Sequence, residues 1–357
     1  YEKAIEINPD YFESYNGMGV AFRENQQFEE AEKILKHAIK LNPKFAEAHY
    51  NLGYVLSLIG DNKNSIHHQK LAVALDPNSV IFLHSLLFYM NYSPNMSAEE
   101  IFEYYEQFDQ RFGLPHKHKW KTFAQPKVPK NKLKIGYVSP DFKGHSMQSF
   151  LLPTLAHHNH EKFEIFAFAE LENEDKVSQE YKPYIDHWIR TDRMTDGELA
   201  QKIRNLGIDI LVDIAGHTKN SRLKVFAQKP APVSLSWFVG YAYTTGLSAI
   251  DYFLTDKFMA PKGSEHLFSE KLWRLNRYAA IWNYNKNNMG QVSSLPALSK
   301  GFITFGTLTR TIRINDRVIK MWADILKKVP NAKLIINSKN FFNNLKTDSE
   351  FKKKFKD

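Results

Sequence analysis

The chain of 357 residues contains no cysteine. This absence excludes disulfides, thiol nucleophiles and zinc sites built on thiolates, and it suits a reducing cytoplasm, where we expect the protein to reside. No apolar run reaches the length that crosses a membrane, and no signal peptide opens the sequence. The sequence also has neither a GxGxxG dinucleotide fingerprint nor a GxxxxGK[ST] phosphate loop. The commonest nucleotide-binding motifs are therefore missing.

The composition is typical of well-packed globular domains, with 43% hydrophobic and 14% aromatic residues. The 48 basic residues exceed the 39 acidic ones, which gives a formal net charge of +9 and favours anionic ligands such as phosphates. The excess is diffuse, and its densest run, KKKFK at 352–356, is interpreted as the solvated face of a helix. We therefore expect neither a nucleic-acid partner nor a membrane partner.

Residues 1–92 repeat with a period of 34 residues. A proline closes each repeat and an alanine precedes it by five residues: Pro9, Pro43 and Pro77 follow Ala4, Ala38 and Ala72. This period, with small residues where paired helices approach, resembles the tetratricopeptide repeat. We expect the first repeat to be partial and the last, from Val80, to be divergent. Such solenoids bind extended peptides or protein partners in a concave groove.

Residues 93–131 are predicted to form a helix and a linker. Ser97 and Glu100 have the spacing of a capping box, which predicts a helix over 97–113. The proline- and lysine-rich stretch that follows is typical of a linker. His116 and His118 within it are interpreted as solvated loop residues, because no third metal ligand lies nearby in the sequence.

Between 132 and 290 short β-rich runs alternate with helical stretches. The runs are 133–139, 163–169, 208–216, 232–240 and 250–256, and helices are expected over 146–157, 176–188 (interrupted at Pro183) and 196–207. This alternation predicts a parallel sheet covered by helices on both faces. Ligands of such sheets bind at the carboxyl ends of the strands.

Three of these strand ends are polar. They read SPDFKGHS at 139–146, AGHTKNSR at 215–222 and WFVGYAYTTG at 237–246. Backbone N–H groups at helix starts favour anions, so these loops predict a polar cleft on one edge of the sheet.

These segments in this order, followed by FITFGTLTRTIRINDRVIKMW, resemble the protein O-linked N-acetylglucosamine transferases and their SPINDLY relatives, glycosyltransferase family 41. The resemblance implies an α-solenoid followed by two Rossmann-like α/β lobes of GT-B type, with residues 300–357 as the incomplete start of the second lobe. It further implies that a nucleotide sugar binds mainly to that lobe and that the solenoid presents protein acceptors. The implied reaction transfers the sugar to Ser or Thr hydroxyls with inversion, without a required metal or other cofactor.

The resemblance also identifies candidate site residues. His145 matches the family's active-site histidine, which either accepts the hydroxyl proton or positions the hydroxyl. Arg313, nine residues before Trp322, stands where the family has an essential lysine. Arginine keeps the positive charge that a departing diphosphate needs, but its planar fork differs in shape from an ammonium group. Arg310 matches a donor-contacting position.

Further candidates line the sugar pocket. Val239 and Gly240 match backbone positions beside the sugar, and Ala242 replaces the proline of the family's common turn. His217 and Thr218 are candidates for donor contact, with a local turn-stabilising role for His217 as the alternative. The HHNH run at 157–160 is interpreted as solvated surface rather than a metal site, because adjacent histidines do not share a helix face.

The sequence leaves the donor and the activity open. UDP-N-acetylglucosamine is the expected donor and GDP-fucose the alternative, because SPINDLY relatives use it with similar motifs. We expect the 357 residues by themselves to be inactive, since half of the donor cleft would lie beyond them. A solenoid adaptor with an inactive transferase half is the competing hypothesis, motivated by Arg313 and Ala242.

Overall fold

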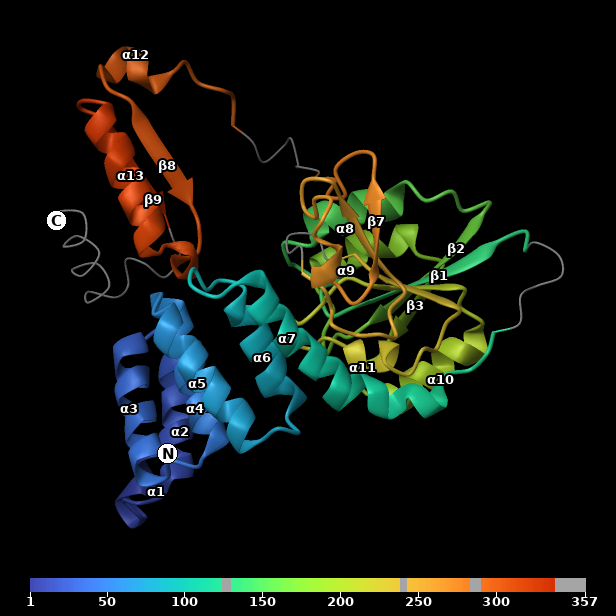
Figure 1. Ribbon diagram of the computed structural model, residues 1–357, viewed down its shortest axis with the longest axis horizontal. Helices are drawn as coiled ribbons and strands as arrows, with labels where there is room; N and C mark the ends of the chain where they lie inside the picture. Colours follow the sequence, from blue (N-terminus) through green and yellow to red (C-terminus); the bar gives the residue numbers. More distant parts are fainter. Residues whose placement is uncertain (124–129, 238–242, 283–289, 338–357) are drawn as a thin grey trace. The chain divides into compact units, whose positions relative to one another are not determined.

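The computed structural model describes residues 1–123, 130–237, 243–282 and 290–337. The chain divides into two compact units (Figure 1), one of Tyr1–Met96 with Met289–Asp357 and one of Ser97–Asn288. The helix and linker expected at 93–131 thus fall mostly in the second unit, and the segment from 300 onward falls in the first.

The first unit begins with the predicted solenoid. Its helices are α1 (Glu2–Ile7), α2 (Phe12–Glu24), α3 (Phe28–Leu41), α4 (Ala46–Ile59), α5 (Asn62–Leu75) and α6 (Val80–Met90). A Cβ atom placed on Gly19 would lie 2.5 Å from the side chain of Leu35, so the close approach of α2 and α3 requires glycine there. The tetratricopeptide prediction is confirmed by this helix pairing.

The first unit also contains a strand–helix–strand segment. It comprises α12 (Pro296–Lys300), β8 (Thr304–Leu308), the 3₁₀ turn η6 (Thr311–Arg313), α13 (Asp316–Lys328) and β9 (Lys333–Asn337). The strands β8 and β9 pair in parallel. This is the order expected for the opening of a Rossmann-like lobe.

The second unit opens with α7 (Ala98–Phe108), whose predicted capping box between Ser97 and Glu100 is present. A π-helical turn, η1 (Asp109–Gly113), and a 3₁₀ helix, η2 (Leu114–Lys119), continue it. The predicted linker thus begins with a short 3₁₀ helix, and Pro115 occupies the first turn of η2, where a missing N–H costs nothing. Trp120 anchors the end of η2 by donating from Nε1 to the Ala227 carbonyl at 2.8 Å.

A seven-stranded parallel sheet forms the centre of this unit, with the order β3-β2-β1-β4-β5-β6-β7. The strands are β1 (Leu133–Ser139), β2 (Phe163–Ala169), β3 (His187–Arg190), β4 (Ile210–Asp213), β5 (Val233–Ser236), β6 (Tyr252–Asp256) and β7 (Lys271–Leu275). The five predicted strands are present, and β4, β5 and β6 are shorter than predicted at one or both ends.

Two strands were not predicted, and one of them corrects the helix expected over 176–188. That helix, α9 (Lys176–Tyr181), ends in a 3₁₀ turn at Lys182–Tyr184, and β3 follows. Both β3 and β7 are edge strands, and their side chains are only half-buried or exposed. An edge strand needs no continuous apolar run, so the hydrophobic pattern did not reveal them.

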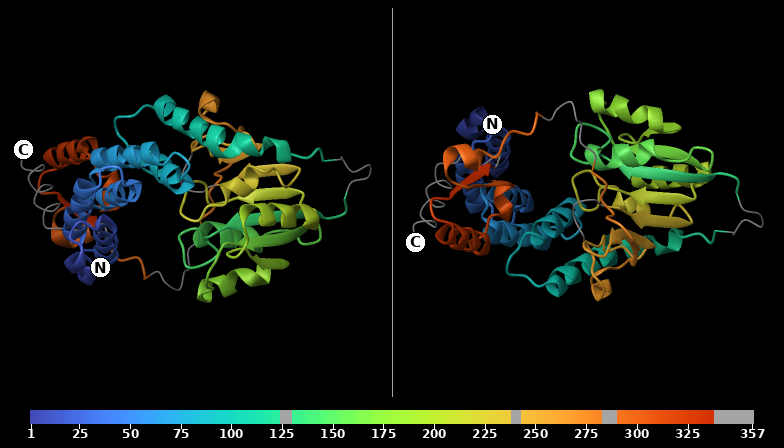
Figure 2. Two further views of the ribbon diagram at one scale, coloured as in Figure 1. Left: turned by 90° about the horizontal axis from the view of Figure 1, so that it is seen from below. Right: turned by 90° about the horizontal axis from the view of Figure 1, so that it is seen from above.

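Helices cover both faces of the sheet. Figure 1 shows α8 (Gln148–Ala156) and α9 on one side and α10 (Asp196–Leu206) and α11 (Leu223–Phe226) on the other, and Figure 2 shows the same layers from two further directions. Leu151 and Leu155 of α8 pack with Tyr181 of α9 on the sheet. Gly207 ends α10 in the left-handed conformation that the predicted glycine stop requires. Within the described residues, no helix combines the length and the apolarity that a membrane crossing needs.

Candidate active site

The candidate site lies where the order of the strands reverses. The chain runs outward from β1 through β2 to β3 and then returns to β4, which pairs with β1 on its other side. In open α/β sheets, ligands bind at such a switch point, outside the carboxyl ends of the strands. The polar segments 139–146 and 215–222 are the loops after β1 and β4.

The loop after β1 is held in place on several sides. The Ser139 hydroxyl accepts a hydrogen bond from the Asp141 amide at 2.9 Å, and the Phe142 carbonyl accepts one from Ser178 Oγ at 2.8 Å. The Gly144 amide donates to Asp175 Oδ2 at 2.7 Å, which ties the loop to the start of α9. Asp141 is buried, and burial raises the pKa of its carboxyl, while His145 acts in the opposite direction.

His145 is exposed and lies at the start of α8, as the sequence indicated. Its Nδ1 lies 3.5 Å from Asp141 Oδ2 and 3.3 Å from the amide nitrogen of Met147. Within the part of the chain that the structure describes, Nε2 of His145 makes no hydrogen bond. The imidazole therefore contacts the protein through Nδ1. The catalytic role of His145 stays a prediction.

The loop after β4 depends on Asp213, the last residue of that strand. Its carboxylate accepts hydrogen bonds from the amides of Ala215 and Gly216, at 3.1–3.2 Å, and from Ser236 Oγ at 2.9 Å. Burial raises the pKa of Asp213 to about 6, and the negative charge of Asp141 adds to the shift. The charge of Asp141 thus acts on Asp213, which follows from the loops after β1 and β4 starting on neighbouring strands.

His217 is buried in this loop. Its Nε2 donates to the Thr245 carbonyl at 2.7 Å, and its ring packs edge-on against Tyr105 and Phe108 of α7. Burial lowers the pKa of His217 to about 4, so the ring is neutral at physiological pH. Thr218 Oγ1 donates to the Ala215 carbonyl within the same turn. These contacts support the turn-stabilising alternative, while donor contact by His217 and Thr218 stays a prediction.

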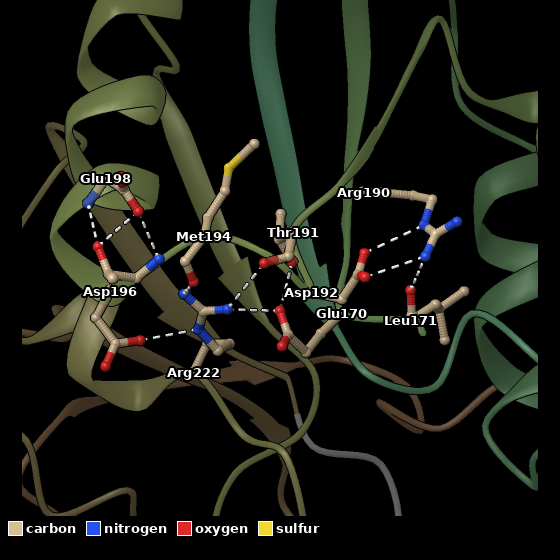
Figure 3. A network of polar contacts seen from close by, with 10 residues as sticks. Glu170, Leu171, Arg190, Thr191, Asp192, Met194, Asp196, Glu198 and Arg222 are labelled. Atoms are coloured by element: carbon tan, nitrogen blue, oxygen red, sulfur yellow. Dashed lines mark hydrogen bonds and ion pairs between the residues drawn. The ribbon is translucent and has the colours of Figure 1, made fainter. Parts of the chain in front are cut away.

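A buried arginine fastens the same loop to the neighbouring strand ends, as Figure 3 shows. Arg222 Nη1 lies 2.5 Å from Glu170 Oε2, and its Nε lies 2.8 Å from Asp196 Oδ1. The guanidinium also donates to the carbonyls of Thr191 and Met194. Arg222 therefore joins the loops that follow β2, β3 and β4.

Sequence reasoning missed Asp141, Asp213 and Arg222. The sequence does contain a signal for the two acidic residues: Asp213 ends a mainly apolar strand and Asp141 follows another by two residues, where a buried carboxylate needs a specific reason. Nothing in the sequence around Arg222 indicated its role, because its partners lie as far as 52 residues away in the chain.

The third polar loop is described only at its ends. Val239, Gly240 and Ala242 lie outside the described residues, so their predicted roles stay untested. Before the loop, Trp237 is buried and donates from Nε1 to the Ala279 carbonyl at 2.9 Å. After it, Thr244 and Thr245 donate their hydroxyls to the buried carboxylate of Glu270.

The two candidate arginines belong to the first unit, beside the end of α6. Arg310 directly precedes the turn η6. Burial raises the pKa of the Tyr89 phenol, and the positive charge of Arg310 acts in the opposite direction. The guanidinium of Arg313, an exposed residue, lies over the Tyr92 ring, 5.8 Å from its centroid. Thr311, between them, contacts Gly60 at the end of α4. The segment expected to contact the diphosphate thus packs against the solenoid.

The histidines of the HHNH run have separate partners. His157 contacts the Pro153 carbonyl, His158 the Tyr137 hydroxyl and His160 the Asp186 carboxylate. Across the ranges that the structure covers, no three His, Cys, Asp or Glu side chains lie together in a way that could hold a metal ion.

Comparisons with known proteins agree with this architecture. The family model described as glycosyl transferase family 41 matches residues 77–289, and tetratricopeptide repeat models match 1–33, 19–60 and 46–79. The solved structure of a mutant O-GlcNAc transferase from Thermobaculum terrenum superposes with a TM-score of 0.89 and 29% identity, covering 99% of this chain and 66% of that one. The predicted fold class, a solenoid followed by the Rossmann-like architecture of GT-B transferases, is thereby confirmed.

Curated relatives show the same similarity. The probable UDP-N-acetylglucosamine–peptide N-acetylglucosaminyltransferase SPINDLY of Solanum lycopersicum is 32% identical over 271 residues, which are 75% of this chain and 29% of the relative. The probable transferase SEC of Arabidopsis thaliana is 30% identical over 233 residues, which are 63% and 24% of the respective chains. The chain thus spans less than a third of the length of these relatives. With the family model matching more than half of its residues, the chain belongs to glycosyl transferase family 41.

Proposed function

We propose that the full-length protein transfers a sugar from a nucleotide-sugar donor to Ser or Thr hydroxyls of proteins, with inversion at the anomeric carbon. The solenoid presents the acceptor protein, and the nucleotide sugar is a co-substrate rather than a resident cofactor. No metal is required in this proposal. The absence of cysteine from the chain supports a reducing compartment such as the cytoplasm.

The main support for the proposal is the loop after β1, at the point where the strand order reverses in this family 41 domain. This loop holds His145 exposed at the carboxyl edge, with Nδ1 turned to Asp141 and the rest of the ring open to an incoming hydroxyl. Transfer leaves negative charge on the departing diphosphate, and fixed cations stabilise such charge without a metal. Arg313, with Arg310 beside it in the chain, supplies candidates for that role.

The donor is proposed to be UDP-N-acetylglucosamine, the donor in the names of the SPINDLY and SEC relatives. GDP-fucose is the alternative donor. An adaptor that no longer transfers sugar is the alternative of another class, and the replacement of the family lysine by Arg313 is the feature that favours it.

Nucleotide binding distinguishes these possibilities. We expect a saturating concentration of either UDP or GDP to raise the melting temperature of the full-length protein by about 2–4 °C, because a ligand at 100 times its Kd adds about 2.7 kcal/mol. ADP and inorganic phosphate serve as controls for binding that does not depend on the base. Stabilisation by one nucleotide identifies the donor, whereas indifference to all four compounds would favour the adaptor and contradict the proposed transferase.

A further inference from the structure

The buried carboxyl of Asp141 has a feature that the proposed function does not explain. Asp141 is only 7% exposed, and its Oδ2 has no hydrogen-bond partner among the described residues. An unsatisfied buried polar atom costs about 1–3 kcal/mol, more when the group is charged, so such an atom in a native protein needs a reason. The nearest group with a proton to share is the imidazole of His145, whose Nδ1 lies 3.5 Å from this oxygen.

The backbone around the pair is rigid enough to orient a side chain. Asp141 and Gly144 are held by the hydrogen bonds to Ser139 and Asp175 already described. Between them, the Phe142 ring is fully buried and packs edge-on against Tyr181 and Trp188, with both centroids 5.4 Å away. Neither Asp141 nor Gly144 can shift its backbone without breaking these contacts, so the backbone that carries Asp141 is fixed up to the residue before His145.

Two hydrogen-bonding arrangements compete at His145 Nδ1. Either Nδ1 carries the proton and gives it to Asp141, or Nδ1 is bare and accepts the Met147 amide, 3.3 Å away. The second arrangement leaves the Asp141 oxygen facing a lone pair in a buried site. The Met147 amide lies at the N-terminus of α8, where N–H groups lack partners within the helix. Met147 is buried, so its amide would lose its partner in the first arrangement, but an unpaired neutral amide costs less than an unpaired carboxylate. The cost of leaving the Asp141 oxygen unpaired therefore outweighs that of leaving the Met147 amide unpaired, and the tautomer with its proton on Nδ1 is favoured.

We propose that Asp141 is a positioning residue for His145: its carboxylate binds the Nδ1–H group and leaves Nε2 as the bare, outward nitrogen. The chemical consequence rests on the proposed function, but the tautomer is a property of the chain itself. In the transfer step, Nε2 takes the proton of the acceptor hydroxyl as the hydroxyl oxygen bonds to the anomeric carbon. The bond from that carbon to the diphosphate breaks, and its electron pair leaves with the diphosphate. A histidine with its proton on Nε2 could not accept the proton there.

Tyr181 is the competing explanation for the Asp141 oxygen. Its hydroxyl also lacks a hydrogen-bond partner among the described residues, and the negative charge of Asp141 adds to the effect of burial in raising its phenol pKa. If the phenol donated a hydrogen bond to Asp141 Oδ2, that oxygen would already have a partner. It would then not favour a proton on Nδ1 of His145. The Tyr181→Phe variant, which keeps the ring and removes the hydroxyl, is therefore the matched control.

The tautomer of His145 is measurable by long-range ¹H–¹⁵N correlation spectra of ¹⁵N-histidine-labelled chain at about pH 8.5, where ordinary imidazoles are neutral. The His145→Gln variant assigns the signal. We expect the proton mainly on Nδ1 in the wild-type chain and in Tyr181→Phe. In Asp141→Ala we expect it mainly on Nε2, and in Asp141→Asn, whose amide oxygen is a weaker acceptor, an intermediate population.

A wild-type spectrum with the proton mainly on Nε2 would overturn the inference without any variant. An unchanged tautomer in Asp141→Ala would also overturn it. In the full-length protein, Asp141→Ala should lower kcat about tenfold to a hundredfold, with little change in the KM for the acceptor peptide. If the wild-type protein transfers no sugar, the proposed function fails while the tautomer result still decides the role of Asp141.

Discussion

The Arg222→Met variant is expected to lower the free energy of unfolding of the second unit by about 3–5 kcal/mol. The guanidinium is 9% exposed and contacts the carboxylates of Glu170 and Asp196. Methionine fills a similar volume but leaves Glu170 without its cation, leaves Asp196 with only Lys224 at 3.8 Å, and leaves the two carbonyls without their donor. The substitution leaves buried polar groups unpaired in addition to removing the attraction, and this makes it the largest stability effect that we predict.

Urea unfolding followed by tryptophan fluorescence tests this prediction, since five of the six tryptophans lie within Ser97–Asn288. The matched control is Arg190→Met. Arg190 also belongs to the contacts of Figure 3, where it pairs with Asp192, but its side chain is 42% exposed. Its loss should cost no more than about 1 kcal/mol. Equal effects of the two substitutions would contradict the structural role assigned to Arg222.

The second large effect is expected in catalysis. Arg313→Ala in the full-length protein should reduce turnover by about 100-fold to 1,000-fold, the cost of removing one group that stabilises charge in a transition state. The fold should survive, because Arg313 is exposed and its position over the Tyr92 ring contributes at most about 1 kcal/mol. Turnover with a nucleotide sugar and a Ser/Thr peptide is the measurement, with the melting temperature as a check on folding.

Arg313→Lys is the informative control for this substitution. It restores the residue type that the family resemblance leads us to expect and keeps the positive charge. Activity at or above the wild-type level in Arg313→Lys, together with its loss in Arg313→Ala, would assign the role to charge at this position. Full turnover in Arg313→Ala would remove Arg313 from the site.

Much of the fold follows from local patterns in the sequence. The 34-residue period predicted the solenoid, the spacing of Ser97 and Glu100 predicted the start of α7, and the apolar runs at 133–139 and 163–169 match β1 and β2 residue for residue. These features are short-range, and each depends on residues within one helix or strand. The edge strands β3 and β7 were missed because they are half-exposed and lack an apolar run.

The site was less predictable, because its contacts join distant parts of the chain. His145 and Arg313 came from the family resemblance, but nothing local indicated that Arg222 reaches Glu170 and Asp196 or that the charge of Asp141 acts on Asp213. For His217 the sequence left two roles open. The aromatic rings of α7, more than 100 residues earlier, enclose its imidazole and favour the structural role.

The most direct test of the central claim is sugar transfer by the wild-type full-length protein. A Ser/Thr-containing acceptor peptide is incubated with UDP-N-acetylglucosamine or with GDP-fucose, and its mass is measured. The account predicts that the peptide gains one N-acetylhexosamine from the first donor, or one deoxyhexose from the second, on a hydroxyl side chain. An acceptor that gains no sugar from either donor, although the protein is folded and binds UDP or GDP, would contradict it.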